Sequence, residues 1–374
     1  MTDVQAPGYR PEEGAPVPSL PAPEPVPNIA AFLDERELCL AGDPRRRENY
    51  KRFLASSRRS EHADYMPPRL DIENVSRCNF RCGMCQVSDW PKGRRAADMD
   101  LDAFKRLIDS QWGLVEIKLQ GMGEPTMQGD DYFAMIRYAR ERNIWVRTTT
   151  NASLLHLKDN YRKLVDSGVN EIQISIDGAD KETFESVRAG GVFERVVDNC
   201  RLINAYCAEQ GIERTKMWTV VQKANHHQLE DFVPLAARLG FTSMAFSTTM
   251  VDWGDPDWRR RNDAQTVDYM RLAEKADVMM RRGEELGVAV RFWSVTSKYS
   301  TAEPAKLCPW PFERGYVSSD LRIVPCCIIG NPETSDLGDA NRLEEEWNGA
   351  AWREFRRAHL EGRIPAVCRS CYED

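Results

Sequence analysis

The chain has 374 residues, 42% of them hydrophobic, so it is long enough for one large α/β domain and a smaller second one. Its formal net charge is −7, from 51 basic and 58 acidic residues. This balance argues against an extended nucleic-acid-binding surface and leaves room only for a local basic patch. Neither a secretory signal nor an apolar run of membrane length appears. We therefore expect no membrane and no nucleic acid among its partners.

The N-terminal part of the chain changes character at about residue 28. The run Pro-Ala-Pro-Glu-Pro-Val-Pro starts neither a helix nor a sheet, so residues 1–28 are predicted to be a disordered tail. Apolar and charged positions then alternate at helical spacing, which predicts a helical N-terminal extension over residues 29–66. Within it, Arg45, Arg46 and Arg47 are predicted to form a solvated helix face.

Three closely spaced cysteines follow the first predicted strand, Arg69–Val75. Cys78, Cys82 and Cys85, in the pattern CxxxCxxC, can ligate three irons of a 4Fe-4S cluster and leave one iron open. A structural zinc site is the alternative, but it needs a fourth ligand. The run resembles the signature of the radical S-adenosylmethionine (radical SAM) superfamily. The resemblance implies that SAM binds the open iron and is cleaved to a 5'-deoxyadenosyl radical. Many members have an aromatic residue where this chain has Met84.

Short β-rich runs and amphipathic helices alternate over residues 67–265, which predicts a parallel sheet. By the resemblance, this region forms the partial (β/α)6 TIM-like barrel of the superfamily, with its active site at the carboxyl ends of the strands. A connecting helix and strand are expected over residues 266–300. The further predicted strands are Val115–Gln120, Ile144–Thr150, Glu171–Asp177, Lys216–Val221 and Ser243–Ser247, and helices are predicted to begin near Asp100, Asp130, Leu157, Lys181 and Gln228.

A glycine-rich turn follows the second predicted strand. The run Gly-Met-Gly-Glu-Pro contains Gly121, Gly123 and Glu124, and taken alone it could be an ordinary turn. It resembles the GGEP motif of the superfamily, which receives the methionyl ammonium of SAM. Glycines let the main chain approach a ligand, and a carboxylate balances a positive group, so these residue types suit that role.

Polar residues also follow the third and fourth strands. Asn151 lies in a segment that, by resemblance, approaches the cofactor or the substrate. Ser175 and Asp177 alternate onto one face of the fourth strand and should point together into the barrel. The resemblance implies that Ser175 binds the cofactor ribose or carboxylate and that Asp177 lies near the substrate. Asp177-Gly178 can equally be a simple strand end.

Three further residues are candidates for the site. Arg188 resembles an arginine that reaches the cofactor carboxylate or a substrate oxygen, and its alternative is a solvated position at a helix end. Val221 resembles a loosely defined adenine contact. Glu73 is predicted to face inward on the first strand beside the cysteines, where it could act as a base or a substrate ligand. We therefore expect the catalytic residues among Asp177, Glu73, Arg188 and, near the C-terminus, Cys327.

A second cysteine set lies near the C-terminus. Cys308, Cys326, Cys368 and Cys371 provide four soft ligands, enough for a zinc ion or a second 4Fe-4S cluster. Behind a radical SAM motif, residues 301–374 resemble a SPASM/twitch domain, which carries auxiliary clusters. The single-cluster arrangement is most similar to that of the aminocyclitol dehydrogenase of butirosin biosynthesis. A cluster with four protein ligands has no open iron, so its expected role is electron transfer.

The four remaining cysteines divide into two groups. Cys39, Cys200 and Cys207 lie among apolar residues and are predicted to pack in the core. Cys327 neighbours a predicted cluster ligand and is predicted to be a spectator, an alternate ligand or a hydrogen-atom donor. Substrate contacts are expected from variable loops, where Asp252, Trp253, Arg291 and Trp293 could line a pocket or simply pack.

The resemblance implies an enzyme with SAM and two 4Fe-4S clusters that abstracts a hydrogen atom from carbon. We favour a radical SAM oxidoreductase that oxidises an alcohol of a sugar, aminocyclitol or related small molecule to a ketone, with the auxiliary cluster as electron acceptor. The alternatives are a carbohydrate epimerase that uses Cys327, a SPASM maturase that modifies a peptide, and a non-catalytic iron-sulfur or zinc scaffold. Exposed reduced clusters do not survive oxidising compartments, so we expect a cytoplasmic enzyme served by a reductant such as flavodoxin or ferredoxin.

Overall fold

The computed structural model describes residues 29–56, 60–89, 97–248, 250–267, 269–293 and 299–372. The predicted proline-rich tail lies outside the described residues. Among the described helices, none is long and apolar enough to cross a membrane.

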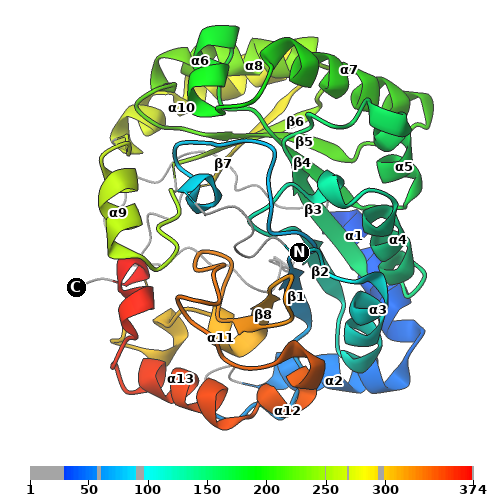
Figure 1. Ribbon diagram of the computed structural model, residues 1–374, viewed down its shortest axis with the longest axis vertical. Helices are drawn as coiled ribbons and strands as arrows, with labels where there is room; N and C mark the ends of the chain where they lie inside the picture. The colour runs from blue at the N-terminus through cyan, green and yellow to red at the C-terminus, as the bar shows by residue number, and fades with distance from the viewer. Residues whose placement is uncertain are drawn as a thin grey trace.

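One sheet forms the centre of the described structure (Figure 1). Its strands are β1 (Arg69–Ile72), β2 (Glu116–Leu119), β3 (Trp145–Thr150), β4 (Glu171–Ser175), β5 (Thr215–Val220), β6 (Ser243–Ser247), β7 (Ala289–Trp293), β8 (Arg314–Val317) and β9 (Ile323–Val324). They lie in the order β7-β6-β5-β4-β3-β2-β1-β8-β9, and every pair is parallel except β8 with β9. The predicted parallel sheet is confirmed, and each of the six predicted strands is present.

The described helices lie around this curved sheet, and those between consecutive strands cover its outer face (Figure 1). They are α1 (Ile29–Ala41), α2 (Pro44–Ala55), α3 (Leu101–Ser110), α4 (Asp130–Arg140), α5 (Asn160–Asp166), α6 (Lys181–Val187), α7 (Phe193–Glu209), α8 (Leu229–Arg238), α9 (Pro256–Asp263), α10 (Tyr269–Leu286), α11 (Trp310–Glu313), α12 (Leu343–Glu346) and α13 (Ala350–Leu360). Asp100 and Asp180 cap α3 and α6 by accepting hydrogen bonds from Ala103 and Thr183. The expected helix starts at Asp130 and Lys181 agree with the structure.

The two faces of the strands differ sharply in polarity. On the outer face Phe246 of β6 packs against Phe232 of α8, with ring centroids 6.0 Å apart. Thr148 of β3 hydrogen-bonds Tyr132 of α4 on the same side. Because side chains alternate along a strand, the neighbouring residues point into the barrel. That inner face is rich in charged and polar residues, a composition that suits contact with a polar ligand more than an apolar core.

The sheet is larger than the six strands predicted for the barrel. β7 extends one edge by pairing with β6, and β8, from the C-terminal cysteine region, pairs in parallel with β1 at the other edge. In this register Asp71 lies opposite Tyr316. An open barrel would leave the backbone groups of β1 unpaired on one side, and β8 satisfies them. The C-terminal region is therefore built onto the barrel edge rather than tethered to it.

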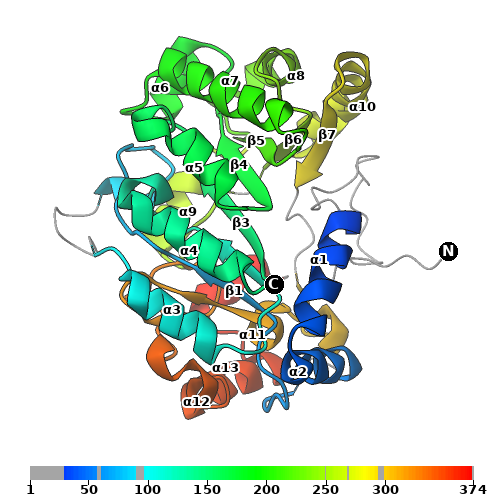
Figure 2. The same ribbon diagram turned by 90° about the vertical axis from the view of Figure 1, so that its right-hand side faces the viewer.

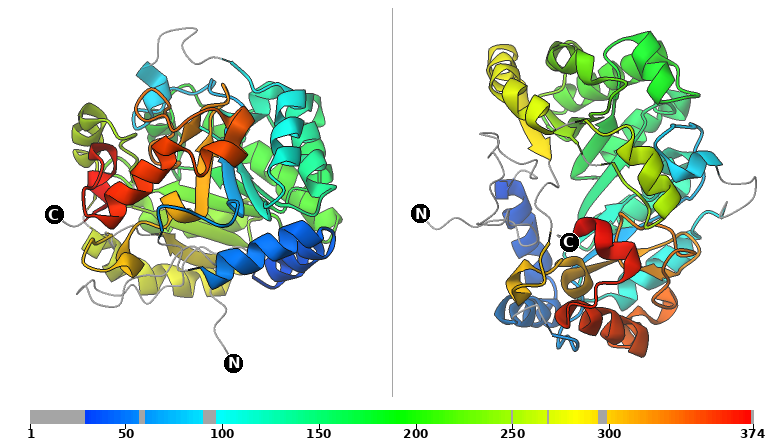
Figure 3. Two further views of the ribbon diagram at one scale, coloured as in Figure 1. Left: turned by 90° about the horizontal axis from the view of Figure 1, so that it is seen from below. Right: turned by 90° about the vertical axis from the view of Figure 1, so that its left-hand side faces the viewer.

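The segment before β1 also binds the C-terminal region, which lies beside α2 in Figure 3. The Trp347 indole donates to the Tyr65 carbonyl at 2.8 Å, and the Tyr65 hydroxyl donates to the Phe312 carbonyl at 2.8 Å. Arg356 is fully buried and stacks over Trp347 at 4.1 Å. Burial lowers the pKa of Arg356 to about 9. These contacts join segments about 280 residues apart into one core.

The N-terminal helices lie at the opposite end of the strands from the first cysteine run (Figure 2). Phe32 of α1 packs edge-on against Trp145 at 5.5 Å. The predicted solvated arginine face is wrong for Arg46, which is 7% exposed. Its guanidinium donates to the carbonyls of Trp112, Cys39 and Arg142. The helix meets the barrel at this point, so the middle arginine of the run is enclosed.

The core cysteines behave as predicted. Cys39 and Cys200 are 0% exposed, and Cys207 is 4% exposed. Burial raises the pKa of the Cys207 thiol to about 11, and Arg214 only partly offsets it. Cys200 and Cys207 pack as small apolar groups, whereas the buried Cys39 thiol also accepts from the Arg46 guanidinium at 3.2 Å and donates to the Leu114 carbonyl at 3.7 Å.

We predict that Arg46→Ala lowers the free energy of unfolding by about 2 to 4 kcal/mol, because three buried carbonyl oxygens lose a charged donor. Arg45→Ala is the matched control, since its side chain is 60% exposed and ion-paired only at the surface. It should change stability by less than about 1 kcal/mol. Chemical denaturation measures both variants, and equal losses would contradict the assignment.

Candidate active site

The first cysteine run lies at the carboxyl end of β1. The thiols of Cys78, Cys82 and Cys85 are close enough to raise one another's pKa values. Burial is the larger cause and raises the pKa of Cys78 and of Cys85 to about 12. The Arg188 guanidinium acts in the opposite direction on Cys82. Buried thiols of this kind ionise when a metal supplies positive charge, which is the chemistry that an iron cluster requires.

The glycine-rich turn after β2 contacts the backbone that leads into this cysteine run. A Cβ at Gly123 would overlap the carbonyl oxygens of Val75 and Arg77, so only glycine permits the contact. The Glu124 amide donates to the Arg77 carbonyl at 2.9 Å. Gly121 packs in the same way against the side chain of Glu73. The motif therefore fixes the backbone that enters the cysteine run, in addition to its predicted role in binding SAM.

Glu124 is 2% exposed and accepts hydrogen bonds from three residues. The hydroxyls of Thr126 and Thr150 lie 2.5 and 2.6 Å from Oε1, and the Asn151 amide lies 2.7 Å from Oε2. Burial raises the pKa of this carboxyl despite the donors. Glu124 thus joins the ends of β2 and β3. The predicted contact with the methionyl ammonium of SAM stays a prediction.

Other loops at the same end of the barrel hold the cysteine run. The side-chain nitrogen Nδ2 of Asn151 lies 4.0 Å from Cys78 Sγ and 3.0 Å from Asn79 Oδ1. Gln222 donates to Met84 Sδ at 3.3 Å, and Asn262 donates to the Met84 carbonyl at 3.2 Å. The contacts of Gln222 and Asn262 were not predicted, because nothing in the sequence links these loop residues to a methionine more than 130 positions earlier.

Asp177 and Arg188 form a buried ion pair beside the cysteines. Arg188 donates to Asp177 Oδ2 from Nε at 2.7 Å and from Nη2 at 2.6 Å. The Val220 amide donates to Asp177 Oδ1 at 2.7 Å. Burial works against the charge on Arg188, but Asp177 and the neighbouring Cys82 outweigh it and raise its pKa. The two predicted residues are thus brought together, and their catalytic roles stay predictions.

Ser175 and Val221 occupy different surroundings. Ser175 lies on the inner face of β4, is 8% exposed, and its hydroxyl has no hydrogen-bond partner among the described residues. It remains available for a ligand. Val221 is 1% exposed, and its amide donates to the Ser247 carbonyl, so the strand arrangement accounts for its position. The predicted adenine contact of Val221 stays a prediction.

Glu73 connects the barrel with the C-terminal region. It is 0% exposed, and Oε2 accepts from the Met122 amide at 3.0 Å and from the Tyr316 hydroxyl at 2.9 Å. Oε1 accepts from the amide and the hydroxyl of Ser319, at 3.1 and 3.0 Å. Because it accepts these four hydrogen bonds, the Glu73 carboxylate is a structural link between the two domains. Its predicted role as a base has no support from this geometry.

The four C-terminal cysteines also gather. Burial raises the pKa of Cys368, and the neighbouring Cys308 and Cys371 raise it further. Burial also raises the pKa of Cys326, and the neighbouring Cys327, Cys368 and Cys308 raise it further. Among the described residues, no three His, Cys, Asp or Glu side chains converge on a point that would suit a single metal ion. Four thiols are the ligand number that either a structural zinc ion or a 4Fe-4S cluster requires.

Cys327 differs from Cys326 in the charged groups that act on its thiol. Burial raises the pKa of the Cys327 thiol to about 12, and the next largest effects come from Asp71 and Lys118, on the inner faces of β1 and β2. Apart from burial, Cys326 is therefore influenced mainly by the neighbouring cysteines, and Cys327 mainly by charged residues of the barrel interior. Asp252 lies near the auxiliary cysteine set, since its carboxylate raises the pKa of Cys368.

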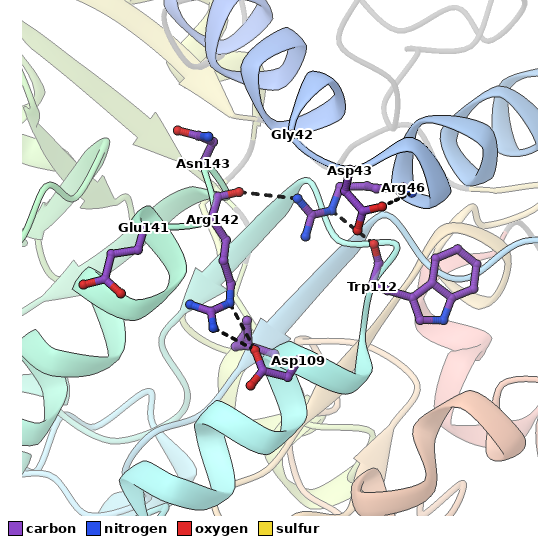
Figure 4. A pocket seen from close by; sticks show the side chains of 9 residues that line it. Gly42, Asp43, Arg46, Asp109, Trp112, Glu141, Arg142 and Asn143 are labelled. Atoms are coloured by element: carbon purple, nitrogen blue, oxygen red, sulfur yellow. Dashed lines mark hydrogen bonds and ion pairs between the residues drawn. The ribbon is translucent and has the colours of Figure 1, made fainter.

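A pocket with a volume of about 380 Å³ lies elsewhere, at the amino ends of β2 and β3 (Figure 4). Both arginines that line it have partners. Arg46 donates to the Trp112 carbonyl, and Arg142 pairs with Asp109 at 3.0 Å. Barrel enzymes place their chemistry at the carboxyl ends of the strands, so this pocket is a structural junction between α2, α3 and α4.

Two family models match the chain. The radical SAM superfamily matches residues 74–236, and an iron-sulfur cluster-binding domain, SPASM, matches residues 308–372. The matched segments contain both cysteine sets described above. The chain carries a radical SAM domain and a C-terminal SPASM domain, and these domains imply SAM, the 4Fe-4S cluster that binds it and auxiliary iron-sulfur clusters as cofactors. Cys78, Cys82 and Cys85 would hold the first cluster.

Similar proteins have varied functions. A tungsten-containing aldehyde ferredoxin oxidoreductase cofactor-modifying protein of Pyrococcus furiosus is 28% identical over 190 residues, covering 48% of this chain and 51% of its own. The mycofactocin maturase MftC of Mycolicibacterium smegmatis is 31% identical over 180 residues, covering 47% and 43%. The chain thus spans about half the length of these relatives. Streptococcus suis SuiB, solved with precursor peptide SuiA, has a TM-score of 0.57 at 17% identity, covering 78% of this chain and 67% of that one, which shows a shared fold.

We predict that replacing Cys78, Cys82 and Cys85 together by Ala abolishes 5'-deoxyadenosine formation and leaves about four irons per chain in the C-terminal set. Iron analysis and electron paramagnetic resonance of the anaerobically reconstituted protein measure this. Loss of all iron with zinc in its place would contradict an auxiliary cluster.

We also predict that Ser175→Ala weakens SAM binding by about 1 to 3 kcal/mol without lowering stability, because its hydroxyl faces the barrel interior unpaired. Thr219→Val is the matched control. Thr219 lies on the next strand but donates to the Ile176 carbonyl on the outer face, so its loss should lower stability and leave SAM affinity unchanged. Equilibrium binding on reconstituted protein tests both, and wild-type affinity of Ser175→Ala would show that SAM binds elsewhere.

Proposed function

We propose that this enzyme removes a hydrogen atom from a hydroxyl-bearing carbon of a polar substrate and oxidises that carbon to a ketone. The observation that carries the proposal is the division between Cys326 and Cys327. The Cys326 thiol lies near Cys308 and Cys368 of the auxiliary set, and the next thiol lies close enough to Asp71 and Lys118 of the barrel for both to affect its pKa. A substrate bound there would lie beside the auxiliary site, which suits transfer of an electron away from it.

When bound, SAM and its cluster supply the radical that abstracts the hydrogen atom, and the auxiliary cluster can accept one electron. The protein must then hold the carbon in place, exclude water and receive the hydroxyl proton. Arg188 and Asp177 lie at the cysteine run, where a charged pair can orient the polar groups of a ligand. Ser175 provides an unpaired hydroxyl on the same inner face.

The inner face supports a small polar substrate, such as a sugar or an aminocyclitol. Charged residues line it on successive strands, and an apolar substrate would leave them without partners. The enzyme would receive its first electron from a reductant such as flavodoxin or ferredoxin. A cytoplasmic location follows from the instability of exposed reduced clusters under oxidising conditions.

Two other reactions have specific support. The position of Cys327 favours epimerisation, in which its thiol would return a hydrogen atom to the carbon radical. Similarity to the maturase MftC and to SuiB, which was solved with a precursor peptide, favours a peptide substrate. A peptide side chain with a hydroxyl group could enter the same polar interior.

We predict that the reconstituted enzyme, with dithionite and SAM, converts a member of a defined panel of aminocyclitols, hexoses and hydroxyl-containing peptides to a product lighter by two hydrogens. Mass spectrometry measures the change. An unchanged mass with deuterium gained from solvent would instead indicate epimerisation.

Cys327→Ala and Cys326→Ala form a matched pair for this test. Oxidation should continue in Cys327→Ala, which lacks the interior thiol, and should fail in Cys326→Ala, which lacks an auxiliary ligand. Retained product formation in Cys326→Ala would contradict a role for the auxiliary cluster. Loss of turnover in Cys327→Ala, with iron content unchanged and solvent deuterium in the wild-type product, would replace oxidation by epimerisation.

A further inference from the structure

On the inner face of the barrel, charged side chains near the amino ends of the strands form ion pairs with one another, and we call this layer the floor of the barrel. Glu116 of β2 binds Arg69 of β1 and Arg147 of β3, each at 3.3 Å. Glu171 of β4 binds Lys216 of β5 at 3.1 Å. These pairs lie toward the amino ends of the strands. Each buried charge in this floor has an opposite charge within contact distance, as is usual for charges that serve structure.

Asp71 differs from these residues. It lies on the same face of β1, between Arg69 below and Glu73 above, and it is 5% exposed. No described residue hydrogen-bonds its carboxylate or forms an ion pair with it. Lys118, directly across on β2, influences it electrostatically but lies beyond the 4.0 Å contact distance. Burial raises the pKa of Asp71, and Lys118 only partly offsets this.

Other polar groups around Asp71 also lack partners. The Cys327 thiol lies close enough for Asp71 to raise its pKa. Gln120 Oε1, directly after the neighbouring strand β2, and Arg147 Nε, one strand further on β3, are buried without a hydrogen-bond partner among the described residues. A protein that needed these groups only for folding would pair them, since each unsatisfied buried group costs stability. Their convergence on one face points to a ligand with several hydrogen-bonding groups.

We propose that Asp71 binds the hydroxyl group on the reacting carbon of the substrate and accepts its proton. The inference rests on the proposed oxidation and adds the proton acceptor that this reaction needs. In the step, the O–H bond of the substrate breaks, the proton moves to an Asp71 carboxylate oxygen, and the electron pair stays on the substrate oxygen. Lys118 and Arg147 lie on adjacent strands, where their positive charges stabilise the negative oxygen.

The stability of Asp71→Asn tests this assignment without any substrate. A buried carboxylate with no partner destabilises the protein, so the amide of the same shape should leave the melting temperature of the anaerobic holoenzyme unchanged or raise it. Glu73→Gln is the matched variant on the same strand face. It replaces one carboxylate oxygen by an NH2 group, so two of the four donors lose their acceptor and the variant should melt at a lower temperature. A fall for Asp71→Asn as large as that for Glu73→Gln would overturn the proposal.

Turnover of the substrate found by the panel gives the second readout. With substrate deuterated at the reacting carbon, Asp71→Asn should still transfer deuterium to 5'-deoxyadenosine, because hydrogen abstraction precedes proton transfer. Product formation should fall by about 100-fold or more, the usual effect of removing a proton-transferring group. Asp71→Glu should recover part of it.

The outcomes separate this inference from the proposed function. If Asp71→Asn forms product at the wild-type rate, Asp71 is not the proton acceptor although the oxidation stands. If the panel yields only epimerised product, the oxidation fails and Asp71 has no proton to accept. In that case a melting temperature at or above the wild-type value still assigns the Asp71 carboxylate to ligand binding rather than to the fold.

Discussion

The active site depends on the close contact between the glycine-rich turn after β2 and the backbone that leads into Cys78. Only a residue without a side chain can occupy position 123, because Val75 and Arg77 present carbonyl oxygens there. The Glu124 carboxylate then joins this turn to Thr150 and Asn151 at the end of β3. A short flexible cysteine run thereby becomes a rigid one, which a cluster with three fixed ligands requires.

The C-terminal domain shares this rigidity because it is part of the same sheet. β8 pairs with β1, and Glu73 on β1 accepts hydrogen bonds from Tyr316, Ser319 and the Met122 amide. The carboxylate therefore contacts the cofactor turn and the auxiliary domain at once. Fixed relative positions matter for electron transfer, because its rate falls steeply with the separation of the two centres. The barrel edge, which would otherwise be unpaired, thus serves as the attachment surface.

The charges inside the barrel illustrate a conflict between stability and function. Ion pairs such as Arg69 with Glu116 neutralise the floor. Above them the Asp71 carboxylate is buried without an equivalent partner, near the half-buried thiol of Cys327. Burial of this carboxylate costs folding free energy in the absence of ligand, and natural proteins keep such costs mainly where binding recovers them. The large apolar core on the outer face, which includes Phe246 and Phe232, provides the stability that offsets them.

The sequence by itself determined the chemistry, because a CxxxCxxC run and four later cysteines restrict the ligand set whatever the fold. It also determined the parallel sheet, since strand and helix periodicities are local properties of the chain. The pairing of β8 with β1 and the burial of Arg46 were decided only by the tertiary structure. The tertiary structure also decided that Glu73 links the two domains and that Asp71 faces the barrel interior without a partner among the described residues. Asp71 and Glu73 share one face of one strand, and their alternation is visible in the sequence. What separates them is that the Tyr316 hydroxyl and Ser319 donate hydrogen bonds to Glu73 and not to Asp71, and such contacts between residues about 245 positions apart form only when the chain folds.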